Sequence, residues 1–97
     1  MKITNKNGEL SFKGEFVLDN IEDVKEQLTL LINKIKTKEV KLNLIDVVEI
    51  DSAGIQLILS FCKTLKKNEI AYSITKVNDD ISNILEISGL GRFMNLV

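Results

Sequence analysis

The sequence predicts a single α/β domain: a mixed β-sheet, with an N-terminal hairpin followed by parallel strands, and about three helices packed mainly on one face. Three observations support this prediction. A hairpin signal lies near the N-terminus, and strand and helix patterns alternate after it. The 97 residues, 44% hydrophobic and 28% charged, suit one globular unit over residues 1–97. Strands separated by helices favour parallel pairing with right-handed crossovers.

The first third of the chain has the pattern of a hairpin followed by a helix. Strands are expected over residues 2–5 and Glu9–Phe16, joined by Lys6-Asn7-Gly8, because Asn and Gly both tolerate the positive φ of a tight hairpin turn. Asp19 followed by Glu22 resembles a capping box and predicts a helix start. Apolar residues then recur at helical spacing to about Lys36: Ile21, Val24, Leu28, Leu31 and Ile35.

The middle of the chain changes from a strand pattern to a helix pattern. Residues 40–44 alternate between apolar and polar, as expected for a strand, and residues 45–50 are less regular. After Asp51-Ser52-Ala53-Gly54, the apolar spacing becomes three and four. The helical stripe consists of Ile55, Ile58, Leu59, Cys62 and Leu65. The sequence therefore predicts strand, short loop and helix, with the tetrapeptide at the helix N-terminus.

The last third predicts a strand over residues 70–75 and a third helix. Asn78-Asp79-Asp80 is expected to cap this helix, and Gly89 suits its C-terminal cap. Residues 92–97 are apolar and are expected to form a last strand or a packed tail. The expected core contains Leu10, Phe12, Leu28, Leu31, Leu42, Leu44, Leu59, Phe61 or Cys62, Ile74, Ile84 and Leu85.

The loops that follow the strands are the candidate site. Residues 17–19, 51–54 and 78–80 are expected to approach one edge of the sheet, where such folds often bind ligands and partners. The first N–H groups of a helix lack internal partners and carry partial positive charge. Asp51 or Ser52 can cap them, and a phosphate on a hydroxyl there would also be stabilised. The same residues are equally an ordinary structural cap.

Composition excludes several other functions. The chain has no histidine and one cysteine, which removes histidine-dependent catalysis and a structural zinc site. Asp46, Glu49 and Asp51 lack calcium-loop spacing, so a solvated loop is expected rather than a metal site. No phosphate-binding glycine motif occurs, and no enzyme activity or cofactor is predicted.

Charge and hydropathy bear on partners and location. Net charge is −1, with 13 basic and 14 acidic residues and no basic block, so no nucleic acid partner is expected. The sequence has neither a signal-peptide pattern nor an apolar run long enough for membrane insertion. A reducing, cytoplasmic location is expected, with Cys62 as a small core residue.

Several segments together resemble the STAS domain family, which includes anti-sigma-factor antagonists. The resemblance covers nearly the whole chain. It rests on Asp51-Ser52-Ala53-Gly54-Ile55 preceded by Leu42-Asn43-Leu44, on residues 10–15 and on residues 84–91. It implies a β-α fold and partner switching, in which an antagonist binds an anti-sigma factor that is also a serine kinase. Phosphorylation of the second hydroxyl residue of the motif breaks that complex, and a phosphatase restores it.

This chain departs from the family pattern at the position that the switch needs. Ala53 stands where the resemblance places the phosphoacceptor, and alanine has no hydroxyl. Ser52 is the alternative acceptor; binding without covalent control and a structural role in an assembly also stay open. Val17 and Gln56 are further departures, each consistent with drift or with a different partner. The candidate motif and partner-binding residues are Asp51, Ser52, Ala53, Gly54, Gln56, Val17, Asp19 and Asn78.

The leading hypothesis is a non-catalytic STAS module that binds a protein partner in bacterial signal transduction, without the usual serine switch. The partner expected from the resemblance is an anti-sigma factor with a kinase-like fold or a signalling phosphatase. One alternative is an accessory STAS subunit of an ABC-type or anion transporter. Another is a nucleotide or small-ligand sensor, because a helix N-terminus can hold an anion.

Overall fold

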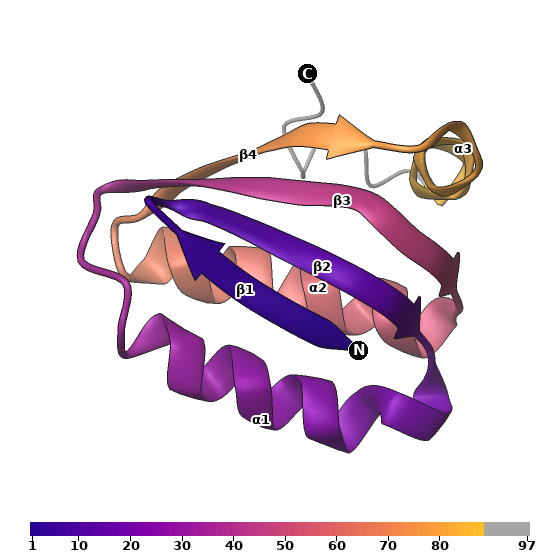
Figure 1. The fold of residues 1–97 in the computed structure, drawn as a ribbon, viewed down its shortest axis with the longest axis horizontal. Helices are drawn as coiled ribbons and strands as arrows, with labels where there is room; N and C mark the ends of the chain where they lie inside the picture. The colour runs from indigo at the N-terminus through magenta and orange to yellow at the C-terminus, as the bar shows by residue number, and fades with distance from the viewer. Residues whose placement is uncertain (89–97) are drawn as a thin grey trace.

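The structure is a computed structural model, and it describes residues 1–88. Its elements are β1 (Lys2–Lys6), β2 (Glu9–Phe16), the 3-10 helix η1 (Leu18–Asn20), α1 (Ile21–Ile32), β3 (Glu39–Ile50), α2 (Ser52–Lys67), β4 (Ala71–Val77) and α3 (Asp79–Ile87). The strands form one sheet in the order β1-β2-β3-β4, antiparallel between β1 and β2 and parallel thereafter (Figure 1). The α/β mixed sheet predicted from the sequence is confirmed.

The N-terminal hairpin forms where the sequence predicts it. Asn7 and Gly8 connect the strands with φ values of 54° and 86°, and Lys6 pairs with Glu9. Both connecting residues are therefore in the left-handed region, which Asn and Gly adopt at low cost.

The start and the end of α1 differ from the prediction. The N-cap is Asn20 and makes no side-chain cap hydrogen bond, so the capping box predicted from Asp19 and Glu22 is wrong. Asp19 lies inside η1, in helical rather than extended backbone, and an N-cap normally needs an extended residue. The helix ends at Ile32 instead of about Lys36.

β3 is longer than predicted and continues to Ile50. Its buried residues change spacing from two to three: Val40, Leu42, Leu44, Val47 and Ile50. The change occurs beside register shifts against β2, between Ser11 and Lys13 and between Gly14 and Glu15. Each shift moves the alternation by a residue, which is why residues 45–50 look irregular in the sequence although they form a strand.

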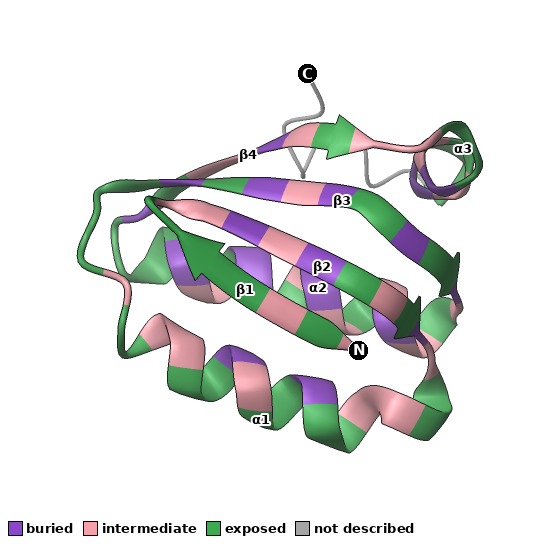
Figure 2. Ribbon diagram, in the orientation of Figure 1, coloured by how far each residue is buried: buried purple, intermediate pink, exposed green. Residues whose placement is uncertain are grey.

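The core lies between the sheet and the two longer helices. α1 and α2 pack against each other on one face of the sheet (Figures 1 and 2), and α3 contacts β3. Of the predicted core, Leu31, Leu59 and Ile84 are only half-buried, and they pack against the core from helix flanks. The others are buried: Leu10, Phe12, Leu28, Leu42, Leu44, Phe61, Cys62, Ile74 and Leu85.

Cys62 is a core residue, as predicted. Its side chain is fully buried on α2, and burial raises the pKa of the thiol to about 12. A thiol held in its neutral form is a poor nucleophile, so Cys62 has a packing role. The predicted cap at Gly89 and the predicted strand or tail over 92–97 lie outside the described residues.

Candidate functional site

Asp51 joins the start of α2 to the loop that follows β2. It is the N-cap of α2, in extended backbone with φ −115° and ψ −175°. Its Oδ1 accepts a hydrogen bond of 2.9 Å from the Gly54 N–H, and its Oδ2 accepts one of 2.9 Å from the Leu18 N–H. One carboxylate therefore caps the helix and fixes the neighbouring loop, so that two of the three predicted site loops are in direct contact.

These hydrogen bonds also change the acidity of Asp51. The Gly54 N–H and then the Leu18 N–H hold the pKa of this carboxyl below its ordinary value, because both favour the ionised form. The lowered pKa means that protonation is harder in the folded chain than in the unfolded chain. Asp51 therefore contributes stability above its unfolded pKa, and this contribution is lost as pH falls through the folded value.

We expect acid to remove a stabilising contribution that the variant Asp51→Asn lacks. Melting temperatures measured between neutral pH and about pH 2.5 should fall more for the native chain than for Asp51→Asn, with the gap closing below about pH 4. Asp19→Asn is the matched control, because it removes an exposed carboxylate from the neighbouring loop after β2. A constant gap between the native chain and Asp51→Asn across this range would contradict the prediction.

Gly54 allows the start of α2 to lie directly against the end of β2. A Cβ atom built on Gly54 would overlap the Phe16 carbonyl oxygen, and it would lie 2.8 Å from the Phe16 carbonyl carbon and 3.0 Å from Ile50 Cγ1. The same Phe16 oxygen accepts a hydrogen bond of 3.3 Å from the Asp51 N–H. Gly54 is thus required by close packing between two elements rather than by a turn.

The remaining residues of the tetrapeptide are less constrained. Ser52 is exposed and Ala53 is half-buried in the first turn of α2, and Gln56 is exposed one turn later. Asp51 serves as the cap, and no side-chain hydrogen bond within residues 1–88 involves the Ser52 hydroxyl. Ser52 is therefore not needed as the cap, contrary to one of the two options open from the sequence.

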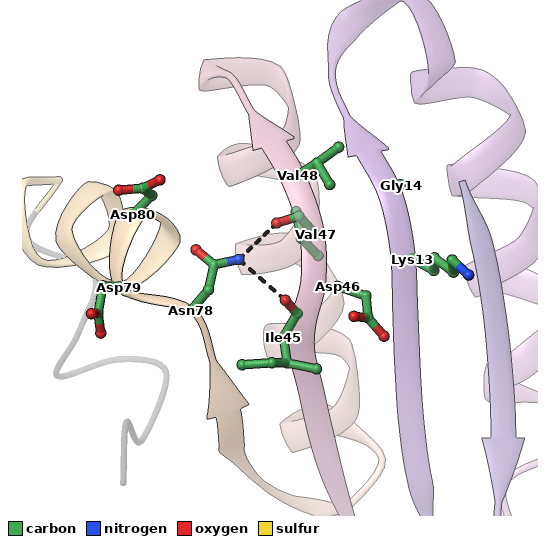
Figure 3. A pocket seen from close by; sticks show the side chains of 9 residues that line it. All are labelled: Lys13, Gly14, Ile45, Asp46, Val47, Val48, Asn78, Asp79 and Asp80. Carbon is green, nitrogen blue, oxygen red and sulfur yellow. Dashed lines mark hydrogen bonds between the residues drawn. The ribbon is translucent and has the colours of Figure 1, made fainter.

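The loop that follows β4 contacts β3 several residues before the end of β3. β4 pairs with β3 only as far as Leu44, so among residues 1–88 no strand lies beside the rest of β3 on this side. The Asn78 side-chain amide donates to the Ile45 carbonyl at 3.3 Å and to the Val47 carbonyl at 2.8 Å, as Figure 3 shows. Its Oδ1 accepts from the Ile81 N–H at 3.0 Å and caps α3.

Asn78 therefore attaches α3 to β3. The loop lines an open depression of about 690 Å³ (Figure 3), formed with Lys13, Gly14, residues 45–48 and the first turn of α3. The hydrogen bonds of Asn78 run to β3 and to α3, whereas Asp51 is bonded to the loop after β2. Among residues 1–88, the side-chain hydrogen bonds of the third predicted loop thus reach β3 and α3 but neither of the other two loops.

We expect Asn78→Ala to lower the free energy of unfolding by about 2 kcal/mol, because it removes a helix cap and leaves strand carbonyls without a donor. Asn78→Asp is the informative partner variant, since it keeps a cap acceptor but has no amide to donate. Urea denaturation should place Asn78→Asp between the native chain and Asn78→Ala. Equal stability of the native chain and Asn78→Ala would show that these hydrogen bonds contribute nothing.

The described residues offer little for other kinds of site. Within residues 1–88 no cluster of three metal-ligating side chains occurs. No helix in the same part of the chain is long and apolar enough to cross a bilayer.

Two features at this edge of the sheet were not predicted from the sequence. Leu18 is 65% exposed although it is a large apolar residue next to the Asp51 hydrogen bond. Glu15 and Glu49 are paired across β2 and β3, and both are exposed. The register shifts that create this pairing leave no simple signal in the sequence. The exposure of Leu18 could have been suspected from its place between two elements, outside either apolar pattern.

Comparison with solved structures places the fold among bacterial anti-sigma factor antagonists. An anti-sigma factor antagonist from Mycobacterium paratuberculosis superposes with a TM-score of 0.81 at 14% identity, covering 98% of this chain and 81% of that one. The anti-sigma factor antagonist SpoIIAA in its unphosphorylated form gives 0.75 at 16% identity, covering 99% and 86%.

Sequence comparison identifies the family to which the chain belongs. An anti-sigma-B factor antagonist of Staphylococcus aureus is 30% identical over 88 residues, which are 91% of this chain and 81% of that protein. The family model described as STAS domain matches residues 1–97. The chain therefore belongs to the STAS domain family, and it is similar to the anti-sigma factor antagonists within that family.

Proposed function

We propose that this chain is a non-catalytic cytoplasmic module that binds an anti-sigma factor through the start of α2, and that it does so without a serine phosphoswitch. The observation that carries the proposal is Ala53 at the motif position where the family resemblance places a phosphoacceptor. Similarity to a protein named as an anti-sigma-B factor antagonist supports the choice of partner.

The geometry is suited to holding a docking surface in one shape. Asp51 bonds to both flanking segments, and Gly54 brings the end of β2 into contact with α2. Ser52 and Gln56 are exposed on this support, with Ala53 between them. A rigid surface loses little conformational entropy on binding, which favours affinity. Val17 and Asp19 border the same support and belong to the proposed surface.

The mechanism that follows is constitutive binding. In a switchable relative, a phosphate would add about 1.5–2 negative charges and the bulk of three oxygens to the docking surface, and the cost of desolvating that group would displace a partner packed closely against a small neutral residue. Ala53 keeps its position neutral at all times. The amount of free partner would then depend on the concentration of this chain and on competition, rather than on a kinase and a phosphatase.

The test uses the anti-sigma factor encoded in the same genome, identified by its similarity to the anti-sigma-B factor of Staphylococcus aureus. Calorimetric titration should give a measurable Kd for the native chain and an increase of at least about tenfold for Ala53→Glu. An acidic residue in the first turn of a helix is favourable to folding, so this variant should stay folded. Ser52→Glu is expected to weaken binding in the same direction.

Ser60→Glu is the matched control, because it places the same charge at an exposed position on α2, farther from the motif. It should bind like the native chain. Undiminished binding of both Ala53→Glu and Ser52→Glu would exclude this surface, and absence of any binding by the native chain would exclude the proposed partner.

A further inference from the structure

Large apolar side chains are exposed where β2 and β3 end. Leu18 is 65% exposed and Val48 is 75% exposed, and each lies two residues from the final cross-strand pair, Phe16 with Ile50. The Leu18 backbone is held by η1 and by its hydrogen bond to Asp51, so the point at which this exposed side chain leaves the backbone is fixed. A large apolar side chain on a backbone that is already ordered can fill a pocket of a partner with little further loss of conformational entropy.

Acidic residues lie within three positions of Leu18 or Val48 along the chain, and we call three of them, Glu15, Asp19 and Glu49, the acidic rim. All three are exposed, and Glu15 is paired with Glu49 on the adjacent strand. Neighbouring carboxylates repel each other, so this pairing lowers the stability of the free chain. The acidic rim thus carries an electrostatic cost that packing of the free chain does not explain.

Within residues 1–88 the acidic rim forms no ion pair. Residues 14–24 and 42–62 contain no Lys or Arg. Within residues 1–88 the ion pair that the structure contains joins Lys76 to Glu9, at 3.9 Å, on the part of the sheet near the hairpin. The acidity is local, because net charge is only −1 and lysines gather at the opposite end of the strands: Lys34, Lys36, Lys38, Lys66 and Lys67.

We propose that the partner docks on this rim with a basic surface, in which Lys or Arg side chains face the acidic rim and an apolar pocket receives Leu18. The inference rests on the proposed function and specifies the chemistry of the partner's binding surface. Charge complementarity of this kind acts mainly on the rate of association, and apolar burial acts mainly on dissociation. The two contributions can therefore be measured separately.

The first experiment changes the charge of the acidic rim. Association of the full chain with the anti-sigma factor of the same genome is followed by stopped-flow fluorescence at increasing salt. Glu15→Gln combined with Glu49→Gln should slow association about tenfold at low ionic strength, with the difference disappearing near about 0.5 M salt. The same variant should unfold at an equal or higher urea concentration, because it relieves repulsion. Slower association without a loss of stability would distinguish a docking role of these residues from a structural role.

The control removes equal charge at the other end of the strands. Glu39→Gln combined with Glu69→Gln should leave association unchanged, since both residues are exposed and lie at the other end of the strands, at the start of β3 and just before β4. For the apolar contact, Leu18→Ser should speed dissociation at least about tenfold, whereas Leu30→Ser, at a 56% exposed position on α1, should not.

Each outcome decides the proposal. Slower association of the acidic-rim variant together with faster dissociation of Leu18→Ser supports it. Native-like rates in both variants, with the native chain binding normally, would overturn this inference and leave the proposed function standing. No binding by the native chain would remove the proposed function and this inference with it. Self-association that is lost in the acidic-rim variant would instead assign the rim to the lysine-rich end of a second copy.

Discussion

Replacing Gly54 by alanine is expected to lower the free energy of unfolding by about 3–5 kcal/mol, the largest stability effect anticipated for this chain. The added methyl group would overlap the Phe16 carbonyl oxygen and would lie 3.0 Å from Ile50 Cγ1. The nearest atoms belong to the backbone at the end of β2, and they cannot move without breaking the pairing of Phe16 with Ile50. Relieving the clash would therefore cost backbone pairing at the end of β2.

Urea denaturation followed by far-UV circular dichroism measures this effect. Ala53→Gly is the matched control, because it changes the adjacent helical residue by one methyl group and costs only about 1 kcal/mol through backbone entropy. If the domain lies near the lower end of the ordinary stability range, at about 5 kcal/mol, Gly54→Ala should be partly unfolded at moderate temperature and Ala53→Gly should not. Similar urea midpoints for these two variants would rule out the close approach of β2 and α2.

This packing separates the residues of the Asp51–Gly54 tetrapeptide that hold the structure together from those that are left at the surface. Asp51 is occupied as a cap and as an acceptor for the Leu18 N–H, and Gly54 is occupied by the contact with Phe16. Ser52 and Ala53 have no comparable duty. Substitution at these two positions is therefore expected to leave the fold intact.

The sequence was sufficient for features that depend on local chemistry. The hairpin at Asn7-Gly8 follows from the backbone preferences of two residues, and the start of α2 follows from Asp51 and the helical spacing after it. The cap at Asn78 follows in the same way, from an amide oxygen before an acidic first turn. Such signals lie within a few residues and need no knowledge of tertiary packing.

Features that depend on other strands could not be predicted. The continuation of β3 to Ile50 is hidden because its buried spacing changes at register shifts against β2. The failure of Asp19 as a cap depends on η1, and η1 is fixed by the hydrogen bond from Leu18 to Asp51, 33 residues away in sequence. The pairing of Glu15 with Glu49 has the same origin, so the acidic rim became visible only in the structure.

Ala53→Ser is expected to create a phosphorylation site at residue 53. Residue 53 lies in the first turn of α2 and is half-buried, so a serine fits with little change in volume. The positive end of the helix stabilises a phosphate added there. Incubation with the anti-sigma factor kinase of the same genome and ATP should add the mass of one phosphate to Ala53→Ser and none to the native chain, as measured by intact mass spectrometry.

The double variant Ser52→Ala with Ala53→Ser identifies the modified residue, because it retains a hydroxyl only at position 53. It should accept one phosphate and then lose affinity for the kinase, in agreement with the added charge of about −1.5 to −2. A phosphate on the native chain that disappears in Ser52→Ala would contradict constitutive binding and make Ser52 the acceptor. That comparison is decisive because, in the part of the chain that the structure describes, Ser52 is exposed and is not used as the cap of α2.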